Sequence, residues 1–157
     1  MIPAGNPWQK EGQLVATSAQ RLEMCQLSTS GNPKIEVLDI EINRSGPTYS
    51  IDTVIDLERI YPGFDFSLVL GTDALKNINS WHRLEELIGK VEFLQLLRSE
   101  ETVQLEDLPK GIEVKVVEGA MLDISSTLIR EKVAKSEDVS ELVDSKILDL
   151  VKGIYGA

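Results

Sequence analysis

The chain has 157 residues, of which 42% are hydrophobic and 27% are charged, a composition typical of one globular domain with its own core. Its 16 basic and 26 acidic side chains give a formal net charge of -10 at pH 7. This charge argues against a nucleic acid or an anionic membrane as partner, because no general basic field attracts either. The single cysteine, Cys25, leaves no pair for an internal disulfide and suits a reducing compartment. The sequence shows neither a bilayer-spanning apolar run nor a signal-peptide pattern, so we expect a cytoplasmic protein without a membrane partner.

Helix-like and strand-like segments alternate along the chain. Helices are predicted at 13–27, from Ser50 onward with Ser50 as the cap, and beyond Arg130, where Val143 and Ile147 have helical spacing. Strands are predicted at 35–42, 66–70, 91–97 and 112–116, and an acidic loop at 100–110. The apolar run at 66–70 is typical of a strand buried on both faces of a parallel sheet. Strands separated by helices predict an α/β fold with a parallel sheet, in which ligands bind beyond the carboxyl ends of the strands.

The most informative segment opens a predicted helix with three hydroxyl side chains, Ser125, Ser126 and Thr127. Such residues cap the unpaired N–H groups of a first helical turn, and the same donors, together with the helix dipole, hold a phosphate. Arg130 follows Ser126 by four residues and Thr127 by three, so these side chains share one helical face. A cation near a helix N-terminus opposes the dipole unless an anion lies in front of it. This favours a phosphate site over the alternative, a plain cap beside a solvated arginine.

Two further motifs follow the apolar strand at 66–70. Gly71 lets backbone approach a ligand and Asp73 is placed to accept hydrogen bonds from ribose hydroxyls; the alternative is a glycine turn with Asp73 capping the next helix. Trp81 stands among polar and charged neighbours, either as a half-buried anchor or as a stacking surface for a flat ring. His82 is the only histidine, which excludes a histidine dyad or cluster, so we expect it to serve local polar structure.

The N-terminal segment 2–10 is rich in turn residues and ends in Lys10, which is either a phosphate contact or part of a plain surface loop. Arg21 and Met24 lie on the first predicted helix. Without a functional role, Arg21 is simply a solvated residue and Met24 a core residue.

In their order and spacing, these segments resemble the bacterial nicotinate mononucleotide adenylyltransferases, members of the nucleotidyltransferase superfamily with a Rossmann-like α/β fold. The matching segments cover almost the whole chain: 3–10 (PAGNPWQK), 21–24 (RLEM), 46–50 (GPTYS), 71–75 (GTDAL), 80–81 (SW) and 124–130 (ISSTLIR). The last segment occurs in varied form across the superfamily. The turn at 47–49 and Trp81 point to the nicotinate branch.

The resemblance implies adenylyl transfer from ATP to nicotinate mononucleotide, which gives deamido-NAD and pyrophosphate in NAD biosynthesis. The residues implied to bind ATP are Gly71, Asp73, Ser125, Ser126, Thr127 and Arg130, with Arg130 as the catalytic residue. Those implied to bind nicotinate mononucleotide are Lys10, Thr48, Tyr49 and Trp81, with Trp81 stacked on the pyridine ring. Magnesium is expected to accompany ATP, with no metal site in the protein itself. ATP and nicotinate mononucleotide are the expected partners, and a homo-oligomer is compatible with the family.

One part of the family pattern is absent from this sequence. The resemblance implies a first strand, a glycine-rich turn and an H-x-G-H motif, whereas His82 is the only histidine here. We therefore expect residues 1–157 to form a single nucleotidyltransferase-like domain that is N-terminally incomplete, whether as a fragment, a late start codon or a natural short form. Two alternatives stay open: a noncatalytic nucleotide-binding remnant, and a related phosphopantetheine or glycerol-phosphate nucleotidyltransferase, which has no need of Trp81.

Overall fold

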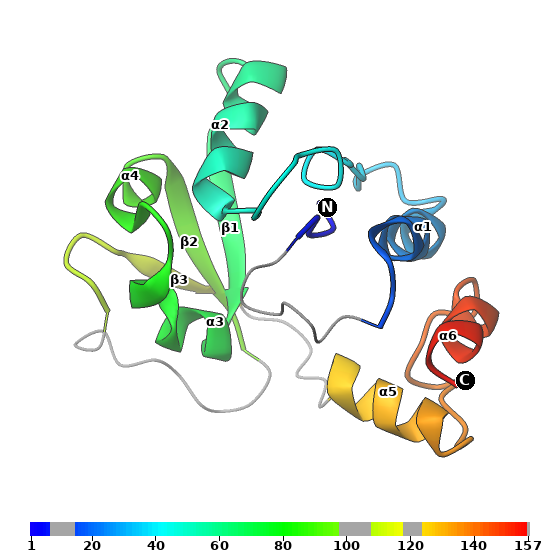
Figure 1. The fold of residues 1–157 in the computed structure, drawn as a ribbon. Helices are drawn as coiled ribbons and strands as arrows, with labels where there is room; N and C mark the ends of the chain where they lie inside the picture. Colours follow the sequence, from blue (N-terminus) through cyan, green and yellow to red (C-terminus); the bar gives the residue numbers. More distant parts are fainter. Residues whose placement is uncertain (7–14, 98–107, 118–123, 157) are drawn as a thin grey trace. The chain divides into compact units, whose positions relative to one another are not determined.

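The computed structural model describes residues 1–6, 15–97, 108–117 and 124–156 (Figure 1). The chain divides into two compact units. The first unit consists of Met1–Thr48 and Ile124–Ala157, and the second consists of Tyr49–Asp123. No helix within the described ranges is both long and apolar enough to cross a membrane.

The second unit is built on a parallel three-stranded sheet. Its strands are β1 (Phe66–Gly71), β2 (Val91–Leu96) and β3 (Val114–Val117), in the order β1-β2-β3. β1 and β2 run parallel with Phe66 opposite Val91 and Gly71 opposite Leu96, and β2 and β3 are also parallel. The strands predicted at 66–70, 91–97 and 112–116 are confirmed, the last one beginning two residues later than expected. The parallel α/β architecture is confirmed with them.

Helices precede and connect these strands. They are α2 (Ser50–Ile60) before β1, then α3 (Thr72–Lys76), the 3₁₀ helix η2 (Ile78–Ser80) and α4 (Leu84–Ile88) between β1 and β2. Both α3 and α4 contact β2, and α2 contacts α4. The predicted helix at Ser50 is confirmed, but the prediction that Ser50 caps it is wrong. Tyr49 is the N-cap residue, its side chain makes no capping hydrogen bond, and Ser50 is already helical.

One face of the sheet carries the core of the second unit. Leu70 and Phe93 lie on that face and are 7% and 2% exposed, whereas Val69 on the opposite face is 56% exposed. The helical residues in the same buried cluster are Ile51, Val54, Leu75, Ile78 and Leu87. The prediction that 66–70 is buried on both faces is wrong for Ser67 and Val69, which are exposed. Burial alternates along β1 instead, as in a strand with one covered face.

The described part of the first unit contains the helices α1 (Ser18–Thr29), α5 (Ser126–Ala134) and α6 (Leu148–Tyr155). Its buried cluster consists of Val133, Val139 and Val151. Met24 of α1 packs against this cluster, which confirms its interpretation as a core residue. The cluster therefore joins helices from the two ends of the chain.

The ends of two predicted helices need correction. α1 begins at Ser18 and not at 13, because Thr17 forms a capping box: its hydroxyl accepts from the Gln20 N–H (3.2 Å) and its own N–H donates to Gln20 Oε1 (2.8 Å). Residues 15–17 precede the helix, and 13–14 lie outside the described residues. Beyond Arg130 the helical prediction holds for α5 and α6 but is wrong for Val143 and Ile147, which precede α6.

The strand predicted at 35–42 is wrong. No strand is assigned there; the Leu38 N–H donates to the Met1 carbonyl oxygen (3.0 Å), and the amino group of Met1 donates to the Glu36 carbonyl. The segment has the apolar alternation of a strand. Its backbone bonds to Met1 do not extend into the row of hydrogen bonds that defines a strand pair. The acidic loop predicted at 100–110 lies mostly outside the described residues.

Replacement of Phe93 by alanine is expected to lower the free energy of unfolding by about 3–5 kcal/mol, because a fully buried ring is deleted from the middle of the sheet. Val69→Ala, on the exposed face of β1, is the control and is expected to cost less than about 1 kcal/mol. Urea unfolding measures both. Equal losses in the two variants would contradict the one-sided core.

Candidate functional site

The carboxyl end of β1 turns directly into α3. Gly71 is the N-cap of α3 with φ -80° and ψ 166°, an extended conformation that any residue adopts. Asp73 lies in the first helical turn, is exposed, and accepts a hydrogen bond from Asn77 Nδ2 at its carbonyl oxygen (2.9 Å). No side chain caps α3, so the alternative in which Asp73 is a helix cap is wrong. The ligand contacts predicted for Gly71 and Asp73 stay predictions.

Gln95 supports this turn and was missed by the sequence reasoning. It is 3% exposed on β2, and its Nε2 donates to the hydroxyl of Thr72 (3.2 Å). A buried amide costs free energy unless it is hydrogen-bonded, so this bond ties the start of α3 to the end of β2. The available signal was a lone amide within the apolar run at 91–97.

Tyr49 and Trp81, two of the residues predicted to bind the nicotinate group, lie in the same unit. Tyr49 precedes α2 and Trp81 follows η2; both are half-buried and pack against the same buried cluster. His82 is exposed and stacks on Tyr49, with ring centroids 4.2 Å apart and an interplanar angle of 28°. Trp81 is thus an anchor by its packing, while its role as a stacking surface stays a prediction.

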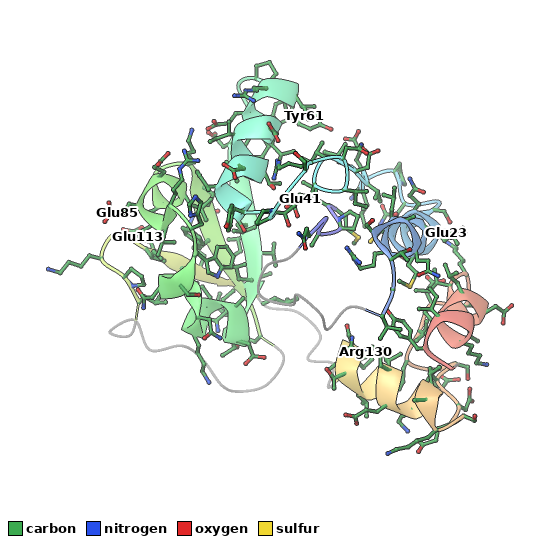
Figure 2. All side chains as sticks on the ribbon, viewed as in Figure 1. Glu23, Glu41, Tyr61, Glu85, Glu113 and Arg130 are labelled. Carbon is green, nitrogen blue, oxygen red and sulfur yellow. The ribbon has the colours of Figure 1, made fainter. Side chains whose placement is uncertain are left out.

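The hydroxyl-rich segment opens α5 as expected. Ser125 is the N-cap, with φ -124° and ψ 150°, and its Oγ accepts from the Leu128 N–H (3.1 Å). Arg130 Nη2 donates to the Thr127 hydroxyl (3.1 Å), so these two side chains share a face, and both are exposed. Figure 2 labels Arg130 on α5. The first turn of α5 holds no acidic residue, so nothing in that turn opposes an anion.

Within the first unit, the backbone carbonyl groups of the N-terminal segment accept hydrogen bonds from other parts of the chain. The guanidinium of Arg21 is half-buried and donates to the carbonyl oxygens of Ala4 (2.5 Å), Gly5 (2.9 Å) and Ala16 (2.8 Å). Thr48 is buried, and its N–H donates to the Asn6 carbonyl oxygen (3.0 Å). The interpretation of Arg21 as a solvated residue is wrong, because its guanidinium connects the N-terminal segment to α1 through these hydrogen bonds. Lys10 lies outside the described residues.

Each unit carries part of the predicted set. The second unit holds Gly71, Asp73, Tyr49 and Trp81, whereas the first unit holds Thr48 and the residues at the start of α5. Within the described ranges no group of three or more histidine, cysteine, aspartate or glutamate side chains is arranged to hold a metal ion. Burial raises the pKa of the Cys25 thiol, which disfavours a thiolate nucleophile at neutral pH.

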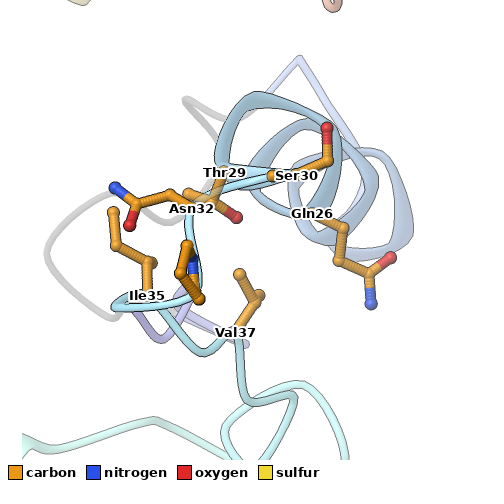
Figure 3. A pocket seen from close by; sticks show the side chains of 8 residues that line it. Gln26, Thr29, Ser30, Asn32, Ile35 and Val37 are labelled. Carbon is orange, nitrogen blue, oxygen red and sulfur yellow. The ribbon is translucent and has the colours of Figure 1, made fainter.

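Surface grooves formed by described residues include two of similar volume. One, of about 640 Å³, is formed at the end of α1 and is lined by Gln26, Thr29, Ser30, Gly31, Asn32, Pro33, Ile35 and Val37 (Figure 3). The other, of about 610 Å³, is lined by Asn79, Arg83, Leu84, Glu85, Glu86, Ile88, Pro109 and Lys110. None of these residues belongs to the predicted site. Two residues of the second groove, Asn79 and Arg83, lie two positions before and after Trp81 in the sequence.

Comparison with known proteins gives the class of the fold and the family. A family model described as cytidylyltransferase-like matches residues 1–132. A probable nicotinate-nucleotide adenylyltransferase from Saccharopolyspora erythraea is 37% identical over 156 residues, which is 98% of this chain and 73% of that protein. One of the same description from Streptomyces coelicolor is 39% identical over 147 residues, covering 94% of this chain and 78% of the relative.

Solved structures agree with this fold. The nicotinic acid mononucleotide adenylyltransferase of Plasmodium falciparum, complexed with NaAD, aligns with a TM-score of 0.72 over 96% of this chain and 77% of its own, at 18% identity. At this identity the likeness shows the nucleotidyltransferase fold. The sequence relatives are closer, so the chain belongs to the cytidylyltransferase-like family and, within it, to the nicotinate-nucleotide adenylyltransferases.

Gly5→Ala is expected to lower the free energy of unfolding by about 1–3 kcal/mol, because a Cβ there would lie 1.9 Å from the Glu41 carbonyl oxygen and displace the segment. Gly153→Ala is the matched control: a Cβ at that position in α6 meets nothing within 4 Å, so about 0.5–1 kcal/mol of stabilisation is expected. Thermal unfolding compares the two. Wild-type stability of Gly5→Ala would show that residues 1–6 are not packed as described.

Proposed function

We propose that this chain transfers the adenylyl group of ATP to nicotinate mononucleotide, which yields deamido-NAD and pyrophosphate. The observation that carries the proposal is the extent of the sequence match. Identity of 37% to a probable nicotinate-nucleotide adenylyltransferase runs over 98% of the chain, so every predicted site segment lies in or beside the match. The family model also runs through both units, which supports one nucleotidyltransferase-like domain over 1–157.

The start of α5 is the proposed phosphate-binding end of the site. Hydroxyl groups and N–H groups at a helix N-terminus bind an anion, and the dipole adds to the attraction. Ser126, Thr127 and Arg130 are exposed there, and the hydrogen bond from Arg130 to Thr127 directs the guanidinium along the hydroxyl-bearing face. Ser125 keeps the helix start in place through its cap. Gly71 and Asp73 are proposed to contact the adenosine part of ATP.

The proposed mononucleotide site uses an aromatic surface. Trp81 would stack on the pyridine ring, and Thr48 and Tyr49 would line the nicotinate pocket through backbone and side-chain contacts, with Lys10 as a phosphate contact. The packing of Tyr49 and Trp81 on one buried cluster supports this assignment, because both rings are held by the core while remaining partly exposed.

The proposed mechanism needs no covalent enzyme intermediate. A phosphate oxygen of the mononucleotide attacks the α-phosphorus of ATP, a new P–O bond forms, and the bond to the β-phosphate bridging oxygen breaks with release of pyrophosphate. Catalysis then consists of positioning the two substrates and neutralising the developing charge, for which Arg130 supplies a guanidinium. Magnesium is written here as part of the substrate, since it binds to ATP phosphates and retains water ligands. ATP and mononucleotides are cytoplasmic metabolites, which supports a cytoplasmic location.

An acceptor comparison tests this proposal. The protein expressed from its native gene is incubated with MgATP and either nicotinate mononucleotide, phosphopantetheine or glycerol phosphate, and pyrophosphate release is recorded. Release with nicotinate mononucleotide alone is expected. Preference for another acceptor would assign a related nucleotidyltransferase, and calorimetric ATP binding without release would assign a nucleotide-binding protein.

Arg130→Ala is expected to lower kcat by about 30- to 1000-fold, which corresponds to about 2–4 kcal/mol of lost transition-state stabilisation. Because Arg130 is exposed, the melting temperature should stay near that of the wild type. Arg59→Ala on α2 is the control, since Arg59 is also exposed and pairs with Asp56, three residues earlier on the same helix (3.3 Å). Near-normal turnover of Arg130→Ala would refute the role given to Arg130.

A further inference from the structure

The two segments that carry Tyr49 and Trp81 are joined by side chains that the proposed chemistry does not use. One segment is the start of α2, and the other runs from η2 into α4. A pyridine pocket between rings on separate segments requires that their separation be fixed, because a small misplacement of a bound substrate is costly. The structure shows two interactions between these segments.

The first interaction is the ring stack between His82 and Tyr49. The centroids are 4.2 Å apart and the planes differ by 28°, so the two rings are stacked. His82 follows Trp81 directly, so the stack holds the backbone on one side of the tryptophan.

The second interaction is centred on the guanidinium of Arg83. Nη1 donates to Asp52 Oδ1 in the first turn of α2 (3.0 Å), 31 positions away in the sequence. Nε and Nη2 donate to Glu86 Oε1 (2.8 Å) and Oε2 (2.6 Å), a bidentate pair. The hydrogen bond with Arg83 lowers the pKa of the Glu86 carboxyl and raises that of the guanidinium, so both groups are charged at neutral pH.

The backbone of Arg83 is itself unusual. Its φ of 52° and ψ of 43° are left-handed, a conformation uncommon for a residue with a Cβ. Such a conformation persists only where the surroundings enforce it. The side chains of Arg83 and Asp52 are 38% and 34% exposed, and exposed ion pairs contribute little to global stability. The effect of the Arg83–Asp52 pair is therefore to fix the local position of the two segments relative to each other.

We propose that His82 and Arg83, with Asp52, form a clamp that fixes the Trp81 segment against Tyr49 and thereby sets the affinity for the pyridine mononucleotide. The three are positioning residues, which act through Tyr49 and Trp81. This inference rests on the proposed function and adds to it the residues that shape the acceptor site.

The test is a kinetic comparison of Arg83→Gln, Asp52→Asn and the double variant. The KM for nicotinate mononucleotide should rise at least about threefold in each, while the KM for ATP and kcat stay within about twofold. The double variant should be no worse than Arg83→Gln alone, because Asp52→Asn weakens an interaction that Arg83→Gln already disrupts. Arg59→Gln, which removes the Arg59–Asp56 pair of the same helix, is the matched control and should change none of these constants.

Substitutions of His82 separate stacking from a general structural role. His82→Ala should raise the same KM, and His82→Phe should restore it, because a phenyl ring keeps the stack on Tyr49. An unchanged mononucleotide KM in Arg83→Gln, an equal rise in both KM values, or failure of His82→Phe to rescue would each overturn the clamp.

A second readout does not depend on turnover. In a Trp8→Phe background Trp81 is the remaining tryptophan of the two, so its acrylamide quenching reports the segment alone. Quenching should increase in Arg83→Gln and His82→Ala but not in Arg59→Gln, and unchanged quenching would count against the clamp. A wild-type protein without adenylyl transfer would refute the proposed function, whereas an active wild type with insensitive variants would refute only the clamp.

Discussion

Parallel pairing of β1 with β2 is the constraint on which the second unit depends. Because the strands run in the same direction, with Gly71 opposite Leu96, both end at one edge of the sheet. The turn after Gly71 therefore meets the end of β2, where Gln95 bonds to Thr72. The same parallel pairing requires a crossover between the strands, and that crossover contains Trp81 and Arg83. The Gly71 turn and the position of Trp81 in the crossover are both consequences of one topology.

The charges proposed to attract the anionic substrates act over short distances. A chain with a formal net charge of -10 repels anions at long range, yet its proposed substrates are anions. The proposed phosphate site at the start of α5 would act at short range, since its first turn lacks acidic residues and Arg130 lies on the face of Thr127. Partial charges at a helix end act within about one turn, so a phosphate bound as proposed would experience them at close range.

Local patterns in the sequence predicted the elements that local chemistry determines. The strand at 66–70, the helix after Tyr49 and the cap at Ser125 follow from apolar runs and a hydroxyl side chain, and all three are present. The strand expected at 35–42 failed because an alternating pattern needs a partner to become a ladder, and the bonds of Leu38 and Glu36 go to Met1.

Other features depend on contacts between distant parts of the chain. The Gln95–Thr72 bond joins residues 23 positions apart, and the Arg83–Asp52 pair joins residues 31 positions apart. No local sequence pattern indicates the left-handed backbone of Arg83, whose side chain bonds to Asp52 and Glu86. The start of α1 was missed for a different, local reason: the capping box between Thr17 and Gln20 begins the helix at Ser18, after the first residues of a weak apolar periodicity. Contacts between residues far apart in the sequence are thus the part of this structure that local patterns did not predict.

The central claim is adenylyl transfer by direct attack on the α-phosphate of ATP. Phosphorus-31 NMR of the protein with MgATP and nicotinate mononucleotide tests it most directly, because each phosphorus product has its own resonance. The expected spectrum shows the resonances of a dinucleotide pyrophosphate bridge, which grow in step with that of inorganic pyrophosphate while both substrates disappear. Formation of ADP with inorganic phosphate, or a spectrum that does not change with time, would contradict it.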